Sequence, residues 1–297
     1  MDKLLQFLGE EITDPSEEAF LVFSQEIPSA NLGFVDSKAT TLEVSIVGKD
    51  ISIRQSPSLL SSNRKEGTTG AVVWKITPLF AEWICGSDNA LFRTGILDST
   101  SHVLELGCGI SGIVSLALAP KIHRYIATDQ DYVLKLLREN IKENEHVFAS
   151  ASSFSKVGKK SRREAHDSNE SSKIDTRSLD WETDAQSNLY NELNIQATSG
   201  EQIDLLIACD CIYNTHLIVP LVNTCAEICR STPKSKPTLC IIAQQLRSAE
   251  VFEEWLSAFH YYFRVWRIPD ELLSGGLKEG NGFVLHFGVL REDSQEK

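Results

Sequence analysis

The feature that most constrains the fold of this chain is a glycine turn between a strand and a helix. Residues 103–107 have the apolar pattern of a buried strand. The strand leads into residues 107–112, which read Gly-Cys-Gly-Ile-Ser-Gly and fit G-x-G-x-x-G. An apolar helix pattern over 113–119 follows, and a second strand, 125–128, ends at Asp129. Glycines there let a backbone pass close to a ligand, and a carboxylate at the next strand end can bind a ribose diol. The sequence therefore predicts a parallel α/β sheet that binds a nucleoside-containing cofactor.

Further strand and helix patterns extend this β-α-β unit. Strands are expected at 174–181, 203–209, 238–243, 263–268 and 282–290, and helices at 131–144, 216–229 and 251–259. A shorter amphipathic helix is expected to begin at Thr77-Pro78, with threonine as the N-cap and proline at the first helical position. The chain is thus predicted to form one α/β domain whose seven-stranded sheet is mostly parallel, with an antiparallel last strand near 283–290.

The domain is expected to carry additions at its start and in its middle. Residues 1–69 are predicted to form an N-terminal extension, a helical segment followed by a β-hairpin over 41–56 that turns at Gly48-Lys49-Asp50. Residues 70–297 then make up the main domain. Within it, residues of about 148–173 are rich in serine and basic residues and predict a flexible insertion. Its basic run could contact RNA or direct nuclear import, although a solvated surface loop is the simpler interpretation.

Composition limits the environment and the partners of the chain. No apolar run approaches the roughly 20 residues that cross a bilayer, and the start of the sequence lacks the pattern of a signal peptide. The seven cysteines are therefore expected to be free thiols in an intracellular protein, cytoplasmic and, through the basic run, also nuclear. The formal net charge of -12 favours a basic protein partner over naked nucleic acid. The sequence requires nothing beyond a monomer.

Several motifs together resemble one family. Residues 105–109 (Glu-Leu-Gly-Cys-Gly) look like motif I of class I S-adenosylmethionine-dependent methyltransferases, which have a Rossmann-like fold. Residues 69–74, Asp129 and the segments 137–140, 179–181 and 210–213 resemble, in the same order, the seven-β-strand protein-lysine methyltransferases; the last of them matches the Asp-x-x-Tyr motif. The resemblance covers about residues 40–291, and within the family it is strongest to the fungal ribosomal lysine methyltransferases. Cys108, Ser111 and the serine-rich insertion depart from the pattern.

This resemblance implies an activity and a set of site residues. It implies transfer of a methyl group from S-adenosyl-L-methionine to a protein lysine, with a basic protein of the large ribosomal subunit as the expected substrate. The implied cofactor-binding residues are Trp74, Gly107, Cys108, Gly109, Asp129, Trp181 and Cys209. Asp210 and Tyr213 follow the end of the strand 203–209, where an open α/β sheet places its reactive crevice. Asp210 is expected to align the substrate amine and Tyr213 to hold the lysine stem, whereas a helix N-cap and a core tyrosine are the structural alternatives.

Other readings of the same residues stay open from sequence alone. A chaperone or an elongation factor could be the methylated protein, the glycine turn could serve an NAD-dependent oxidoreductase, and a non-enzymatic cofactor-binding module is a third possibility. Trp74 could be a core residue, and Arg247 could line the substrate rim or be a salt-bridged surface group. Cys209, Cys211, Cys225 and Cys229 could in principle bind zinc, but their spacing matches no usual zinc site, and buried thiols are expected instead.

Overall fold

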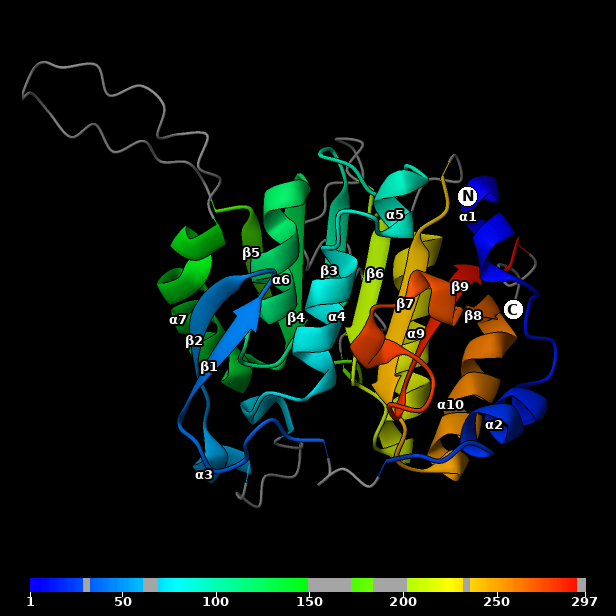
Figure 1. Ribbon diagram of the computed structural model, residues 1–297, viewed down its shortest axis with the longest axis horizontal. Coiled ribbons are helices and arrows are strands. Elements are labelled where there is room, and N and C mark those ends of the chain that lie inside the picture. The colour runs from blue at the N-terminus through cyan, green and yellow to red at the C-terminus, as the bar shows by residue number, and fades with distance from the viewer. Residues whose placement is uncertain (29–32, 61–68, 149–171, 184–201, 232–235, 293–297) are drawn as a thin grey trace, which may run out of the picture.

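The structure, a computed structural model, is built on one seven-stranded sheet (Figure 1). It describes residues 1–28, 33–60, 69–148, 172–183, 202–231 and 236–292. The strands are β3 (His102–Leu106), β4 (Arg124–Asp129), β5 (Ile174–Ser178), β6 (Leu205–Cys209), β7 (Leu239–Gln245), β8 (Phe263–Arg267) and β9 (Phe283–Leu290). Their order is β5-β4-β3-β6-β7-β9-β8, and only β9 runs antiparallel to its neighbours. The prediction of a mostly parallel sheet with an antiparallel last strand is confirmed.

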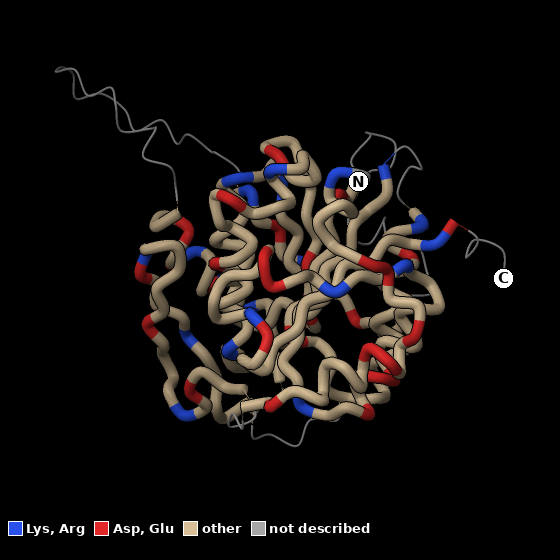
Figure 2. Tube along the Cα trace, turned by 45° about the vertical axis from the view of Figure 1, so that its right-hand side comes forward, with Lys and Arg blue, Asp and Glu red and all other residues tan. Residues whose placement is uncertain are grey.

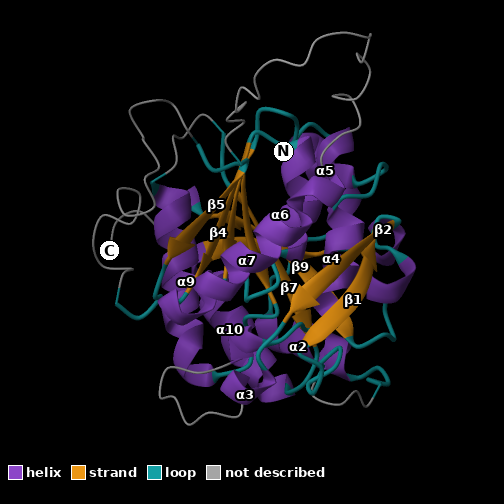
Figure 3. Cartoon of the chain, turned by 90° about the vertical axis from the view of Figure 1, so that its left-hand side faces the viewer, coloured by secondary structure: helices purple, strands orange, loops and turns teal. Residues whose placement is uncertain are grey.

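Helices cover both faces of the sheet and form two apolar cores (Figure 3). One face carries α4 (Ile76–Ile84), α6 (Ile113–Leu118) and α7 (Asp131–Phe148), with α1 (Asp2–Leu8) and α5 (Ala90–Arg93) at its margins. The short helix α3 (Pro57–Leu60) has no buried residue and contributes to neither core. The other face carries α2 (Pro15–Phe23), α9 (Thr215–Arg230) and α10 (Ala249–Tyr262). The strands β6 and β7 are buried at every position, as expected for central strands covered on both faces. The parallel strands thus end at a common edge, where the site lies.

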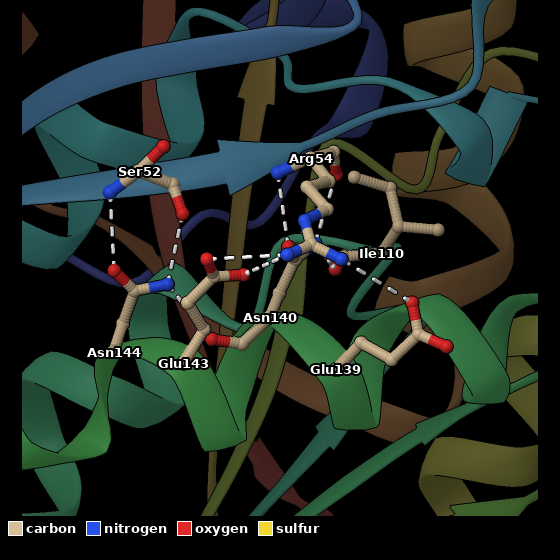
Figure 4. A network of polar contacts seen from close by, with 7 residues as sticks. All are labelled: Ser52, Arg54, Ile110, Glu139, Asn140, Glu143 and Asn144. Carbon is tan, nitrogen blue, oxygen red and sulfur yellow. Dashed lines mark hydrogen bonds and ion pairs between the residues drawn. The ribbon is translucent and has the colours of Figure 1, made fainter.

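A small antiparallel hairpin, β1 (Thr41–Ile46) and β2 (Lys49–Arg54), packs against α7 rather than extending the sheet. Two asparagines of α7 attach it, as Figure 4 shows. Asn144 exchanges hydrogen bonds with the backbone of Ser52 at 3.0 and 2.9 Å, and Asn140 exchanges them with that of Arg54 at 2.9 and 2.8 Å. Asn140 also donates to the carbonyl of Ile110 in the glycine turn at 2.7 Å. The hairpin is therefore linked through α7 to the turn that the sequence singled out.

Several boundaries differ from the sequence predictions: β5 ends at Ser178 rather than at 181, α7 continues to Phe148, and the hairpin turn and the start of α4 are placed differently. The hairpin turns at Val47-Gly48, whose φ angles are 53° and 70°, so the predicted turn at Gly48-Lys49-Asp50 is wrong. Two positive φ angles make a tight two-residue turn of the type that matches strand twist, although valine is unusual there. Helix α4 begins at Ile76, so Thr77 is not its N-cap; Thr77 is buried and bonds to Cys209.

Some predictions fall where the structure gives no test. Most of the predicted insertion, residues 149–171, lies outside the described residues. The division of the chain at residue 69 stays a prediction. All seven cysteines are free and buried, as expected. In the parts of the chain that the structure describes, no helix combines the length and the apolar character needed to span a membrane.

Candidate cofactor and active site

A cavity of about 860 Å³, part of it open to solvent, lies at the carboxyl ends of β3, β4 and β6. All nine residues singled out from the sequence line it: Trp74, Gly107, Cys108, Gly109, Asp129, Trp181, Cys209, Asp210 and Tyr213. The fold therefore brings together residues that are as far apart in the chain as 74 and 213. Other residues also line the cavity without a role that a sequence motif indicates, among them Ser111, Gln130, Tyr132 and Leu217.

The glycine turn needs glycine for both conformation and space. Gly107 and Gly109 each have a φ of 64°, in the left-handed region that favours glycine. A Cβ atom on Gly107 would lie 2.8 Å from the sulfur of Cys211 and 3.0 Å from a ring carbon of Trp181. At Gly109 it would lie 3.3 Å from the carbonyl oxygen of Gly70, and that oxygen accepts a hydrogen bond from Ile110 N at 2.9 Å. The segment around Gly70 thus closes over the turn and narrows the cavity at that point.

Two buried carboxyl groups lie behind the turn. Asp129 accepts hydrogen bonds from Gly109 N at 2.8 Å and Gln130 N at 2.7 Å, and burial raises its pKa to about 6 against the opposing effect of these bonds. Glu105 accepts a hydrogen bond from the Tyr125 hydroxyl at 2.7 Å. Burial raises the pKa of Glu105 to about 7, and the charge of Asp129 adds to this effect. Both groups remain protonated to a higher pH than ordinary carboxyls.

Two tryptophans form apolar walls of the cavity. The ring of Trp181 lies against the glycine turn, and its buried indole nitrogen has no hydrogen-bond partner among the described residues. An unpaired buried donor beside a cavity is suited to a ligand that supplies an acceptor. Trp74 is half-buried, its ring centroid lies 4.6 Å from that of Phe34, and its indole nitrogen donates to the carbonyl of Thr69 at 3.0 Å. Trp74 is therefore both packed and exposed to the cavity.

Asp210 is held by an arginine that lies 37 residues away in sequence. Arg247 donates from Nη1 to Oδ1 at 2.8 Å and from Nη2 to Oδ2 at 2.7 Å, and Gln245 N donates to Oδ1 at 3.2 Å. The Asp210 side chain is 1% exposed and that of Arg247 is 22% exposed. The Arg247 guanidinium also lies 5.1 Å from the ring centroid of Trp74. Of the two roles considered for Arg247, the structure shows the salt bridge, and its partner is the central residue of the predicted site.

The alternative roles for Asp210 and Tyr213 can be compared with this geometry. Asp210 is not a helix N-cap, because Asn214 caps α9 by accepting from His216 N at 3.1 Å. Instead Asp210 has a φ of 62°, a left-handed conformation that is strained for a residue with a side chain. Tyr213 is 38% exposed, so it is not a core residue, and its hydroxyl accepts a hydrogen bond from the Thr69 hydroxyl at 2.9 Å. Strained and exposed residues at a cavity are typical of functional positions.

The cysteines at this edge are structural. Cys211 lies under the turn, with its sulfur 3.2 Å from the carbonyl oxygen of Leu106, and Cys209 forms part of the cavity wall. Burial raises the pKa of both thiols well above the ordinary value, so neither is a reactive thiolate. Cys229 contacts Cys240 at 3.6 Å rather than the pair at 209 and 211. The four thiols of the alternative zinc reading therefore do not form one cluster.

The charges of the cavity distinguish the two cofactors considered from sequence. Its described lining includes the carboxyl groups of Glu105, Asp129 and Asp180, and also Asp210, which is paired with Arg247. None of the described lining residues is a lysine, an arginine or a histidine. The negatively charged pyrophosphate of NAD would lie close to these acids, and the described lining has no basic residue to offset the repulsion. S-adenosyl-L-methionine instead carries a sulfonium and an ammonium, and carboxyl groups in a low-dielectric cavity favour positive charge. The glycine turn, the unpaired Trp181 nitrogen and these acids all fit that molecule.

Comparison with known proteins is consistent with this chemistry. A family model described as lysine methyltransferase matches residues 53–259, which is more than half of the chain. The chain belongs to the lysine methyltransferase family. It is thus a protein-lysine methyltransferase, and family and fold together make S-adenosyl-L-methionine its cofactor.

Several relatives of this methyltransferase carry a more specific name. Ribosomal lysine N-methyltransferase 5 of Zygosaccharomyces rouxii is 30% identical, with 75% of each chain covered. The protein of that name from Lachancea thermotolerans is also 30% identical, over 76% of this chain and 81% of its own. A Schizosaccharomyces pombe protein named diaminohydroxyphosphoribosylamino-pyrimidine deaminase is 28% identical over 88% of this chain, but this chain spans only 54% of it.

Solved structures resemble this chain only remotely. The N-methyltransferase NodS from Bradyrhizobium japonicum, solved with S-adenosyl-L-homocysteine, is 13% identical. The similarity covers 69% of this chain and 90% of that chain, with a TM-score of 0.38.

Cofactor affinity should depend on the protonation of Asp129. Ribose hydroxyls donate to an ionised carboxylate, so affinity should rise as pH increases through the Asp129 pKa of about 6, and it should be about tenfold weaker at pH 5 than at pH 7. Calorimetric titrations with S-adenosyl-L-methionine from pH 5 to 8 measure this. Without ligand the sign is opposite for stability: the ionised form is the one that burial penalises, so stability should fall as pH rises through the same value.

Two variants separate the effect of Asp129 on cofactor binding from that of Glu105. Asp129→Asn should bind more weakly, by roughly 1.5 to 3 kcal/mol, and should lose the transition near pH 6. Glu105→Gln removes the group whose pKa is about 7 and should retain that transition. A transition that disappears in Glu105→Gln and persists in Asp129→Asn would remove the ribose role from Asp129.

Proposed function

We propose that this enzyme methylates a lysine of a basic protein of the large ribosomal subunit. The observation that carries this proposal is the similarity to proteins named ribosomal lysine N-methyltransferase 5 from several yeasts, over three quarters or more of the lengths of two of them. A ribosomal substrate is also consistent with action in the cytoplasm, and a nuclear location is the alternative that the basic run at 156–163 would support.

The charge distribution supports a basic substrate. The chain has a net charge of -12, and acidic positions gather on the side that carries α2 and α10 (Figure 2). Exposed members of this set are Asp14, Glu17, Glu250 and Glu254. Helix α10 begins four residues after Gln245, the last residue of β7, so this acidic side lies near the carboxyl ends of the strands. An acidic surface beside the cavity attracts a basic partner and speeds its association.

The proposed roles of the cofactor-binding residues follow from their places in the cavity. Asp129 would accept hydrogen bonds from the ribose, and Trp181 would lie against the adenine. The turn at Gly107, Cys108 and Gly109 would admit the methionine portion, while Cys209 and Trp74 would form walls. When bound, the cofactor supplies a methyl group on a positively charged sulfur. The residues of the chain must then bring a lysine amine in line with that group.

Methyl transfer requires that the amine of the substrate lysine be neutral, because only the neutral amine has a lone pair to attack the methyl group. The ordinary pKa of a lysine amine is about 10.4. A lone carboxylate would raise that pKa further and oppose the reaction. Asp210 is paired with Arg247, so the pair is formally neutral and favours the ammonium form less than a lone carboxylate would. A carboxylate has about four acceptor positions, and Arg247 and Gln245 use three of them, which leaves one on Oδ2. We assign that position to an N–H of the neutral substrate amine, with its proton lost to water.

Tyr213 would hold the aliphatic stem of the same lysine. Its ring lines the cavity, and its hydroxyl is fixed by Thr69 rather than free to bind the amine. Burial raises the Tyr213 pKa, so the hydroxyl stays protonated at neutral pH. An aromatic wall fixed at both ends limits the orientations of a flexible side chain and so contributes to positioning.

The test is transfer of labelled methyl groups from S-adenosyl-L-methionine into lysate proteins, with ribosomes separated from the soluble fraction. We expect the wild-type enzyme to label a band of the large subunit, Asp210→Ala to leave it unlabelled, and mass spectrometry to place the methyl group on lysine. If label appears only in soluble protein, the lysine methyltransferase activity stands, but the substrate is a soluble factor such as a chaperone. No label in either fraction would contradict the proposed function.

A further inference from the structure

A second hollow, of about 310 Å³, shares the lining residue Tyr213 with the cofactor cavity. We name it the Phe252 pocket. Its apolar walls are Phe23 of α2, Ile212, Leu246, and Val251 and Phe252 of α10. Its polar lining consists of Gln244 and Gln245 of β7, Arg247 and Ser248, besides Tyr213. The rings of Phe23 and Phe252 meet edge to face with centroids 5.5 Å apart. Both hollows are lined by Tyr213, so the proposed lysine position and the Phe252 pocket are adjacent.

Gln244 is the distinctive residue of this pocket. It is 2% exposed, and its side-chain amide nitrogen has no hydrogen-bond partner among the described residues. Leaving a buried donor unpaired costs free energy, so such groups are rare in folded proteins unless something outside the chain binds them. The backbone of Gln244 is paired with β9 opposite Val284, so only the side chain remains to be explained. The pocket thus combines apolar walls with several polar groups, and one of these, the Gln244 amide nitrogen, lacks an acceptor among the described residues.

The size and position of the pocket restrict what can fill it. Neighbouring residues of an extended peptide lie about 3.3 to 3.6 Å apart along the chain, so a residue close to the target lysine can reach an adjacent hollow. The hollow, about 310 Å³ with part of it open to solvent, is much smaller than the cofactor cavity of about 860 Å³ and has room for a side chain. The exposed acidic residues Glu250 and Glu254 belong to the same helix, α10, as Val251 and Phe252, and acids on this helix favour a segment that also carries basic residues.

We propose that the Phe252 pocket binds the side chain of a substrate residue within two positions of the methylated lysine. That side chain has an aliphatic stem, which packs on Phe252 and Val251, and a terminal oxygen, which accepts from Gln244. Glutamine is the side chain that this chemistry fits best. The inference rests on the proposed function and adds to it a determinant of which lysine is chosen.

Two variants of the pocket and one of the surface test this inference. Gln244→Leu keeps the volume and removes the donor, Val251→Trp fills the hollow, and Ser257→Trp adds the same bulk on an exposed position of the same helix. The probe is the salt-extracted protein of the large ribosomal subunit, with the soluble lysate fraction as second probe. Apparent KM, kcat, cofactor affinity and Tm are measured for each variant.

We expect Gln244→Leu and Val251→Trp to raise the apparent KM about tenfold or more. Their kcat and cofactor affinity should stay within twofold of wild type, and Ser257→Trp should match wild type throughout. Gln244→Leu should not lower Tm, because the donor it removes has no partner within the described chain.

Unchanged KM in both pocket variants would overturn the inference while leaving the lysine methyltransferase activity intact. A Gln244→Leu variant that loses Tm at unchanged KM would make Gln244 merely structural. No transfer by wild type to either probe would overturn the proposed function, and this inference with it.

Discussion

Replacing Asp210 by alanine is expected to lower kcat for methyl transfer by about 100-fold, while cofactor affinity changes less than threefold. A 100-fold loss corresponds to about 2.7 kcal/mol in the activation barrier. The reason is geometric: the carboxylate is fixed by Arg247 and Gln245 N and would direct its remaining acceptor position to the substrate amine. Single-turnover rates at saturating cofactor, together with calorimetry for binding, measure the two quantities separately.

The same experiment should show that Asp210 and Arg247 act as a unit. Arg247→Ala leaves a carboxylate that is 1% exposed without its charge partner, and we expect at least a tenfold loss of kcat together with lower stability. The double variant should be no slower than Asp210→Ala alone, because residues of one unit are not additive. Asp175→Ala removes an aspartate of the edge strand β5 that pairs with Arg124 at 2.6 Å and with Arg177 at 3.1 Å. It is the control for the loss of an Asp–Arg contact away from the cavity and should keep its kcat. Independent, additive losses, or full activity in Asp210→Ala, would contradict the assigned role.

The sequence predicts the sheet well because its strands carry strong local patterns. The runs at 103–107 and 205–209 are apolar at nearly every position, and glycine or acidic residues follow them directly. Such patterns are typical of strands buried on both faces. The start of helix α4 is predicted less well. Thr77-Pro78 has the residues typical of a helix start, whereas the helix begins at Ile76. Tertiary contacts decided that boundary: Thr77 is buried against the cavity wall and bonds to Cys209 there.

The site was predictable only where a motif marks it. Each residue at a strand end, such as Asp129 or Asp210, follows an apolar run and can be found from sequence. Arg247 follows β7 in the same manner, but its pairing with Asp210 depends on β6 and β7 being neighbours in the sheet. The Phe252 pocket is harder still to predict from the sequence. It requires α2, from the beginning of the chain, to pack on α10, and neither helix carries a sign of the other in its own sequence.

Replacing Asn140 by alanine is expected to lower the free energy of unfolding by about 3 to 5 kcal/mol. Its side chain is fully buried and makes three hydrogen bonds to backbone groups, two with Arg54 and one with Ile110. Alanine would leave those groups unpaired, at about 1 to 3 kcal/mol for each one that water cannot reach. Urea titration followed by tryptophan fluorescence measures the loss.

The bond to Ile110 gives this prediction a second part, because Ile110 belongs to the glycine turn. Without it the turn loses one of its restraints, and we expect S-adenosyl-L-methionine to bind about three- to tenfold more weakly to Asn140→Ala. Asn144 is the matched control: it is also buried, it also pairs with the backbone of β2, but it makes no bond to the turn. Asn144→Ala should therefore lose stability and keep its cofactor affinity. Glu139→Ala, which removes only an exposed contact of 4.0 Å to Arg54, should change stability by less than about 0.5 kcal/mol. Equal cofactor affinities in the two asparagine variants would show that the hairpin stabilises the fold without positioning the turn.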